Sequence, residues 1–516
     1  MRASGEPSPP RKPFYQAAPI ADNEGGISHV KWSKAVVTTL IKNADWVIAW
    51  EEGAKRHVYR RNIDVAFADD SIVHVGPGFA GQADAVIDGR GRMVMPGLVD
   101  IHAHPSHESV YRGIREEHGV ANMYMSSLYE RSQAFDISDP ALRRASLEVA
   151  LCELLKSGVT SVCDISPIYD GWADVFVKSG MRGFLAPGYA SARWRLSDDH
   201  SLGFDWDEAR GRKGMEAALA FIDGLAKHSS ASLLSGVVSP MQIENCSDDL
   251  LRDSLAAAND RKVPFTLHVA QGVLEHLEMI KRHGVTPIRH ARDIGILGPT
   301  SVIGHAILPD THSWIRWWTK DDIRSLADAG CSVAHCPTPF ARYGILMESF
   351  GDYVRAGVNL GMGTDVSPHN MLEEIRKAGT FARIAARDIN TVSSAMLFHA
   401  ATAAGAKALM REDLGKLKPG AKADLVLVDV THPDMMPARD PLRSLIFHAA
   451  DRAVKDVYVA GRRIVADGKV TTLDHAGAAA RLAEAQARMM AATPKRDYRG
   501  RSAVEIAPLT LPISDQ

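Results

Sequence analysis

The stretch VMPGLVDIHAH, residues 94–104, joins an apolar β-type run to two histidines at its end. Alternate residues of an extended strand point to the same face, so the i, i+2 spacing of His102 and His104 places both imidazoles on one side. Two imidazoles on one face can bind a single metal ion. The stretch therefore predicts a strand that ends in part of a metal site.

Seven further apolar runs follow, separated by amphipathic helical patterns. One separating helix is predicted over residues 140–156, with Asp139 as its N-cap and Gly158 just beyond its end. Alternating strands and helices are typical of an α/β fold with parallel strands, and eight such strands predict a (β/α)8 TIM-like barrel. The eight runs begin at Gly97, Val159, Met181, Ser232, Val263, Thr300, Cys331 and Gly357.

Short β-type runs with Gly, Asp and Asn turn signals lie on both sides of the barrel, which predicts a small composite β-sandwich built from both ends of the chain. The first residues are rich in Pro, Ser and charge, and form either an unstructured arm or an arm that docks on a neighbouring subunit. The predicted organisation is an N-terminal arm (1–33), the first part of the sandwich (34–96), the barrel (97–411), the second part (412–474), and a C-terminal helix and tail (475–516).

The composition favours a small-molecule partner. Sixty Lys and Arg residues against 62 Asp and Glu give a formal net charge of -2, which produces no field for nucleic acid or an anionic membrane. Neither a signal peptide nor a membrane span is predicted. The five cysteines form no closely spaced disulfide framework, so a reducing, cytoplasmic location is expected.

Three more metal-ligand residues lie where predicted barrel strands end: His268 on strand five, His305 on strand six and Asp365 on strand eight. Such strand ends point into the catalytic mouth of a barrel. Any one of these histidines alone is typical of a structural residue, whereas the combination predicts a metal centre. Imidazoles with one carboxylate suit Zn2+ or Fe2+ better than Mg2+ or Ca2+, and Co2+ and Mn2+ are also compatible.

The chain resembles the amidohydrolase superfamily, in the branch of cytosine deaminase and atrazine chlorohydrolase. VMPGLVDIHAH, GMGTD (361–365) and LGKLKPGAKADLVLVD (414–429) carry the resemblance, which covers nearly the whole chain after about residue 36. It implies one metal ion held by His102, His104, His268 and Asp365, with His305 orienting water or substrate. It also implies a homo-oligomer, a dimer or larger.

Relatives with two metals carry a lysine or glutamate at the end of strand four. This chain reads LLSGVVSP there (233–240), with neither residue, so a single ion is expected. That ion acidifies water, and Asp365 is placed to act as general base.

One departure from the resembling ring deaminases lies on strand five, where His-x-x-Glu is replaced by His268-Val-Ala-Gln271. A glutamine cannot titrate, which counts against protonation of a ring nitrogen, although Glu108 is a candidate substitute acid. The sequence therefore predicts hydrolysis of a non-peptide C–N bond in a small, neutral or aromatic amide, urea or carbamate. The alternatives are a deaminase or chlorohydrolase acting on an N-heterocycle, and a non-catalytic scaffold protein.

Predicted substrate contacts lie on loops at the catalytic mouth: Trp314, His335, Arg342, His369 and Glu108. The two histidines are also compatible with structural roles. Arg342 and Arg193 are candidates for binding a carboxylate. The loop after strand one (Tyr111, Met123, Tyr124, Met125, Leu128, Tyr129) and the loop after strand six (Trp314, Trp317, Trp318) suit an apolar or aromatic substrate, or bury the loops themselves.

Overall fold

The eight predicted strands form a closed ring of parallel strands in a computed structural model, which describes residues 37–114, 127–198, 201–228, 230 and 232–514. The predicted N-terminal arm lies outside the described residues. The ring strands are β6 (Leu98–Ala103), β7 (Val159–Ser166), β8 (Arg182–Tyr189), β11 (Leu234–Gly236) with β12 (Ser239–Pro240), β13 (Phe265–Val269), β14 (Ser301–His305), β15 (Ser332–His335) and β16 (Asn359–Met362).

The ring consists of two parallel sheets, β6 to β12 and β13 to β16, that meet at both edges. At one edge, Val238 N–H donates to the Pro264 carbonyl at 2.9 Å, and Gln242 forms a bridge with His268. At the other edge, Ala103 forms a parallel bridge with Asp365. The closure brings together residues that are far apart in the sequence.

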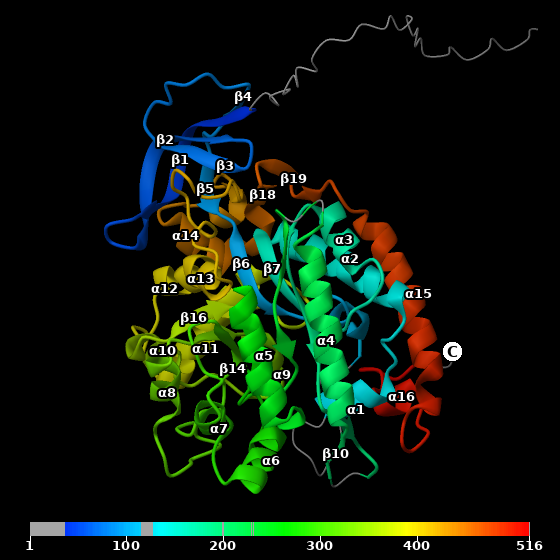
Figure 1. The fold of residues 1–516 in the computed structure, drawn as a ribbon. Helices are drawn as coiled ribbons and strands as arrows, with labels where there is room; N and C mark the ends of the chain where they lie inside the picture. Colours follow the sequence, from blue (N-terminus) through cyan, green and yellow to red (C-terminus); the bar gives the residue numbers. More distant parts are fainter. Residues whose placement is uncertain (1–36, 115–126, 199–200, 229, 231, 515–516) are drawn as a thin grey trace, which may run out of the picture. The chain divides into compact units, whose positions relative to one another are not determined.

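Helices follow the strands and surround the ring (Figure 1). The predicted helix over residues 140–156 is confirmed as α2 (Pro140–Lys156), and the Asp139 side chain accepts from the Ala141 N–H at 2.8 Å. The others in this region are α1 (Ser127–Ala134), α3 (Trp172–Ser179), α4 (Glu208–Leu225), α5 (Asp248–Arg261), α6 (Val273–His283), α7 (Pro287–Asp293), α8 (Asp322–Asp328), α9 (Pro337–Arg342), α10 (Phe350–Ala356), α11 (Met371–Ala386), α12 (Ser394–His399) and α13 (Gly405–Ala408).

A second, nine-stranded sheet is built from both ends of the chain, with blue and orange strands side by side in Figure 1. β5 pairs with β1 on one side and with β17 on the other. Hydrogen bonds join all nine strands into one sheet, so the composite origin is observed and the division into a two-sheet sandwich is not confirmed. The strands are β1 (Thr38–Glu51), β2 (Arg56–Ala68), β3 (Ser71–Gly76), β4 (Ala85–Asp88), β5 (Arg92–Pro96), β17 (Leu425–Asp429), β18 (Val454–Val459), β19 (Arg462–Ala466) and β20 (Lys469–Val470).

The C-terminal region packs on the barrel. α15 (His475–Ala492) lies against α2, and Ala478 and Leu482 share an apolar cluster with Leu142 and Val149. Shorter elements are α14 (Pro441–Ser444), α16 (Ala503–Ile506) and the hairpin of β9 (Ala192–Arg195) and β10 (Gly203–Trp206). Within the described residues, no helix has the length and apolar character needed to span a membrane.

A buried ion pair connects the ring to the composite sheet. Arg182, which begins β8, donates from Nε and Nη2 to the two carboxylate oxygens of Asp424 at 2.6 and 3.0 Å. Both side chains are 2% exposed. The Ala460 N–H also donates to Asp424 at 2.8 Å. Such a bidentate contact fixes the orientation of two elements as well as their distance.

We expect Asp424→Ala to lower the free energy of unfolding by about 3–5 kcal/mol, because it leaves the Arg182 guanidinium buried and unpaired. Denaturant titration measures the change. Asp205→Ala, which removes an exposed ion pair with Arg195, is the control and should cost less than about 1 kcal/mol. A similar small loss in both variants would contradict the structural importance of the buried pair.

Candidate metal centre

Five side chains converge at the carboxyl ends of the ring strands. His102 lies in β6, His104 follows it, His268 lies in β13, His305 ends β14, and Asp365 follows β16. All five are at the same end because parallel strands share one carboxyl edge. The closure of the ring positions Asp365. The Asp365 N–H donates to the His102 carbonyl at 3.0 Å, and the Asp365 carbonyl accepts from the His104 N–H at 2.9 Å.

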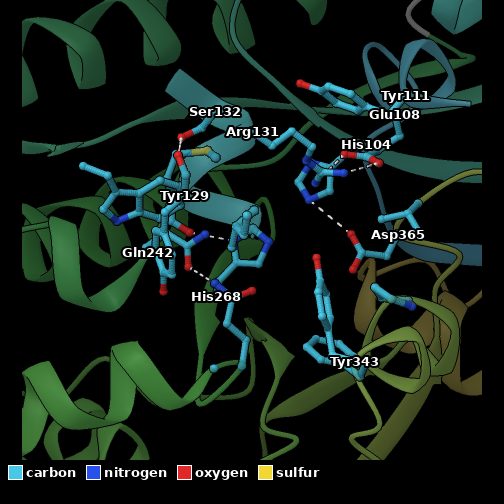
Figure 2. Close-up of a pocket in the computed structure, with 18 of the residues that line it drawn as sticks. His104, Glu108, Tyr111, Tyr129, Arg131, Ser132, Gln242, His268, Tyr343 and Asp365 are labelled. Carbon is cyan, nitrogen blue, oxygen red and sulfur yellow. Dashed lines mark hydrogen bonds and ion pairs between the residues drawn. The ribbon is translucent and has the colours of Figure 1, made fainter. Parts of the chain in front are cut away.

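The potential ligand atoms lie close together. Asp365 Oδ1 is 3.4 Å from His104 Nε2 and 3.9 Å from His102 Nε2 (Figure 2 labels His104 and Asp365), and Asp365 Oδ2 is 3.5 Å from His305 Nε2. Two triplets, His102 with His104 and His268, and His102 with His305 and Asp365, each have ligand atoms within 4.8 Å of one another. These separations suit ligands that bond one ion at about 2.0 to 2.2 Å.

Backbone carbonyls orient three of the imidazoles. Nδ1 of His104 is 2.9 Å from the Ile165 carbonyl, that of His268 is 2.6 Å from the Met241 carbonyl, and that of His305 is 3.1 Å from the Ala334 carbonyl. A carbonyl only accepts, so each Nδ1 carries the proton and donates. The lone pair of each ring is therefore on Nε2, as metal ligation requires.

His102 provides the test of whether a cation fits. Its side chain is fully buried, and both ring nitrogens lack a hydrogen-bond partner within the part of the chain that the structure describes. A buried polar atom without a partner is costly. A cation bound by His102 Nε2 removes that cost at one nitrogen, so the residues fit a metal ion of the borderline, nitrogen-preferring type.

Burial also keeps the imidazoles neutral. It lowers the pKa of His268 to about 3, with neighbouring His104 acting in the same direction, and it lowers the pKa of His102 and His305 well below the usual value. Burial raises the pKa of Asp365 to about 7 in the absence of an ion. Neutral histidines are the ligand form, and a cation would favour ionised Asp365.

A buried network lies beneath the candidate ligands. Asp100 accepts from the His102 N–H at 3.1 Å and from Thr364 Oγ1 at 2.7 Å. Nδ1 of His369, which is fully buried, lies 2.9 Å from the same Thr364 oxygen. His369 therefore supports the segment that carries Asp365. It does not line the cavity described next, so the structure does not bring it to the substrate space as predicted.

A cavity of about 240 Å3 adjoins the ligand atoms, and His104, His268 and Asp365 form part of its wall (Figure 2). Much of the rest is apolar or aromatic, as expected for the loop after strand one. The cavity-lining residues of that kind are Tyr111, Leu128, Tyr129, Ile137, Trp194, Met241, Val273, Leu274, Phe340, Tyr343 and Val366. Met123, Tyr124 and Met125 lie outside the described residues.

Three predicted contacts lie elsewhere. Trp314 is 46% exposed because its loop turns at His312, whose Nε2 is 3.0 Å from the Leu346 carbonyl. His335 is buried and packs on Phe350. Arg193 is exposed on β9. None of the three lines the cavity.

Glu108 and Arg342 do line the cavity. Glu108 is buried and lies 3.1 Å from Arg131 Nη2. Burial raises the pKa of Glu108, while Arg131 and His104 oppose the shift. Arg342 donates to the Ser367 carbonyl at 2.9 Å.

Gln271 also lines the cavity, and its Nε2 donates to Oε1 of Gln242. Gln242 was missed from the sequence, together with Arg131, Trp194 and Tyr343. Its position just after strand four is a signal that could have found it, because residues at such strand ends point into the catalytic mouth of a barrel. Arg131 lies on α1, Trp194 on β9 and Tyr343 just after α9, and none of the three has a regular spacing relative to the ring strands.

The sequence pattern of the Amidohydrolase family matches residues 93–464. The chain therefore belongs to this family, and the predicted class of enzyme, a hydrolase acting on carbon–nitrogen bonds other than peptide bonds, is confirmed.

Known relatives agree in sequence and in fold. A 5-methylthioadenosine/S-adenosylhomocysteine deaminase of Thermococcus onnurineus is 28% identical over 426 residues, 81% of this chain and 92% of that protein. An adenosine deaminase from Xanthomonas campestris with bound zinc superposes with a TM-score of 0.74 at 22% identity, covering 88% of this chain and 98% of its own. Atrazine chlorohydrolase from Arthrobacter aurescens TC1, complexed with zinc, gives 0.74 at 23% identity, covering 87% and 100%.

We expect the purified protein to hold about one divalent ion per chain, and His102→Asn to lower that content about tenfold or more, because a ligand that the protein fixes in place is lost. Elemental analysis after dialysis measures it. His74→Asn, on β3 of the composite sheet, is the control and should keep the wild-type content. Equal metal content in His102→Asn and the wild type would contradict this metal centre.

Proposed function

We propose that the protein is a mononuclear metal-dependent hydrolase that cleaves a non-peptide C–N bond of a small, neutral or aromatic amide, urea or carbamate. His102, His104, His268 and Asp365 would hold the ion, and Zn2+ is the best candidate. The convergence of these side chains at the floor of an apolar cavity carries the proposal. The absence of lysine and glutamate at the end of strand four supports a single ion.

When bound, the ion supplies acidified water at neutral pH and polarises the substrate carbonyl. Among the described residues, Asp365 is the carboxylate whose oxygens lie close to both His104 Nε2, at 3.4 Å, and His305 Nε2, at 3.5 Å. It would therefore take the proton from water and return it to the leaving nitrogen. His305 donates through Nδ1 to Ala334, which leaves Nε2 as an acceptor. It would therefore orient water by accepting its hydrogen.

Gln271 favours amide-type hydrolysis over ring deamination. Its side chain occupies the cavity wall, where it can hydrogen-bond a substrate but cannot supply a proton. Proton transfer would then depend on Asp365 alone. The aromatic walls provide contact area for an apolar substituent.

A second candidate function is deamination or dechlorination of an N-heterocycle. The names of the relatives favour it, since they include an adenosine deaminase and atrazine chlorohydrolase. Glu108, a buried carboxyl on the cavity wall, would be the acid for deamination, although its ion pair with Arg131 stabilises the ionised form. A chloride leaving group would need no acid.

The location, the oligomeric state and the segment boundaries are also proposals. We propose that the protein is a cytoplasmic homo-oligomer, a dimer or larger, with the segment boundaries 1–33, 34–96, 97–411, 412–474 and 475–516. Five free, buried cysteines support a reducing compartment. The composite sheet supports the joint assignment of the second and fourth segments.

A product-class screen of the metal-loaded protein distinguishes the two candidates. We expect amides, phenylureas and carbamates to release amine, and aminated or chlorinated heterocycles to release neither ammonia nor chloride. Gln271→Glu should slow amine release, because a carboxylate replaces a neutral amide at the substrate. Ammonia release that rises in Gln271→Glu would instead support the deaminase.

We expect Asp365→Asn to lower turnover per bound metal by about 10²- to 10⁴-fold, because an amide cannot accept the proton from water. Rates are divided by the metal content of each preparation, so that loss of a ligand is separated from loss of the base. His369→Asn, which changes a supporting residue outside the cavity, is the comparison and should have a smaller effect. Unchanged turnover per metal in Asp365→Asn would rule out Asp365 as the base.

A further inference from the structure

Two glutamines form a pair on the cavity wall beside the candidate metal centre. Gln242 follows β12 and Gln271 follows β13, two strands that meet at one closing edge of the ring. Both side chains line the cavity, and they are only 3% and 7% exposed. Gln271 Nε2 donates to Gln242 Oε1.

The remaining polar atoms of the pair are complementary to each other. The mutual contact leaves the carbonyl oxygen of Gln271 as an acceptor and the NH2 group of Gln242 as a donor. Exchanging oxygen and nitrogen in both amides reverses the two contributions and still leaves one acceptor and one donor. Neither remaining atom has a hydrogen-bond partner among the described residues, and neither is among their fully enclosed atoms without a partner.

The backbone holds the two side chains in a fixed relation to the metal ligands. Glu275 accepts from the N–H groups of Ala270 at 2.6 Å, Gln271 at 2.8 Å and Gly272 at 3.3 Å. On the other strand, Gln242 forms a bridge with His268. The donor and the acceptor are therefore preorganised before a ligand binds, which lowers the entropy cost of binding.

We propose that the Gln242–Gln271 pair binds the N–H and the adjacent acceptor of an amide-type edge on the substrate. This inference rests on the proposed function and specifies the substrate. A primary amide, a cis-lactam, and a urea or carbamate with a syn N–H present such an edge. A tertiary amide that lacks the N–H does not, and it leaves a buried acceptor of the pair unpaired, which costs binding free energy.

The rest of the cavity defines the other part of that substrate. Tyr129 and Trp194 pack edge to face, with ring centroids 4.8 Å apart, and both line the cavity together with Phe340. Flat aromatic groups pack well against such walls. The preferred ligand thus combines an aryl group with an N–H and carbonyl on one edge.

Quinolin-2(1H)-one and N-methylquinolin-2-one are suitable probes, because they share the ring and carbonyl and differ only in the N–H. We expect the metal-loaded wild-type protein to bind the first about tenfold more tightly, as measured by calorimetry. Gln242→Met and Gln271→Met keep side-chain length but remove the polar atoms, and each should bring the affinity ratio close to one.

Leu128→Ala is the matched control, because Leu128 lines the same cavity and offers no hydrogen bond. It should weaken both probes equally and keep the wild-type ratio. A ratio near one in the wild-type protein, or a ratio that persists in both glutamine variants, would overturn the proposed recognition.

The binding test does not depend on turnover, so it separates the two proposals. Amine release in the product screen with an affinity ratio near one overturns the pair's recognition and leaves the proposed reaction intact. A tenfold ratio without amine release contradicts the proposed reaction and supports the recognition.

Discussion

The hydrogen bonds between the end of β6 and the segment after β16 are the constraint on which the site depends. Asp365 and His102 are far apart in the chain, yet the Asp365 N–H donates to the His102 carbonyl at 3.0 Å. This contact closes the ring and at the same time positions the carboxylate opposite two imidazoles. Geometry that precise cannot come from side-chain packing alone, because side chains change rotamers more easily than a paired backbone changes register.

Burial then determines the chemistry of the residues that the ring brings together. Enclosed imidazoles stay neutral and present a lone pair, while enclosed Asp365 is unfavourable as a bare anion. A divalent cation would stabilise both kinds of side chain, because it bonds the imidazole lone pairs and compensates the negative charge of the carboxylate. The backbone carbonyls of Ile165, Met241 and Ala334 fix which nitrogen is protonated, so the scaffold contributes to ligation as directly as the ligands do.

The sequence predicted the strands and the convergence of the histidines, because period, turn residues and strand ends are local signals. It also predicted α2 with its Asp139 cap. The positions of loop residues were harder to predict. Trp314 turned outward because His312 anchors its loop, and no local pattern reveals that contact. Gln242 could have been predicted, because its place directly after strand four can be seen in the sequence. Trp194 could not, because it lines the cavity from a hairpin whose path depends on tertiary packing. The single nine-stranded sheet likewise follows from long-range pairing of β5 with β17.

That pairing has a consequence for the order in which the protein can be completed during synthesis. β5 emerges early from the ribosome, but its neighbour β17 is made only after the whole ring has been translated. Until then one side of β5 presents unpaired N–H and C=O groups, the kind of exposed edge that invites association with other chains. Pairing of this edge of β5 therefore waits until β17 has been synthesised.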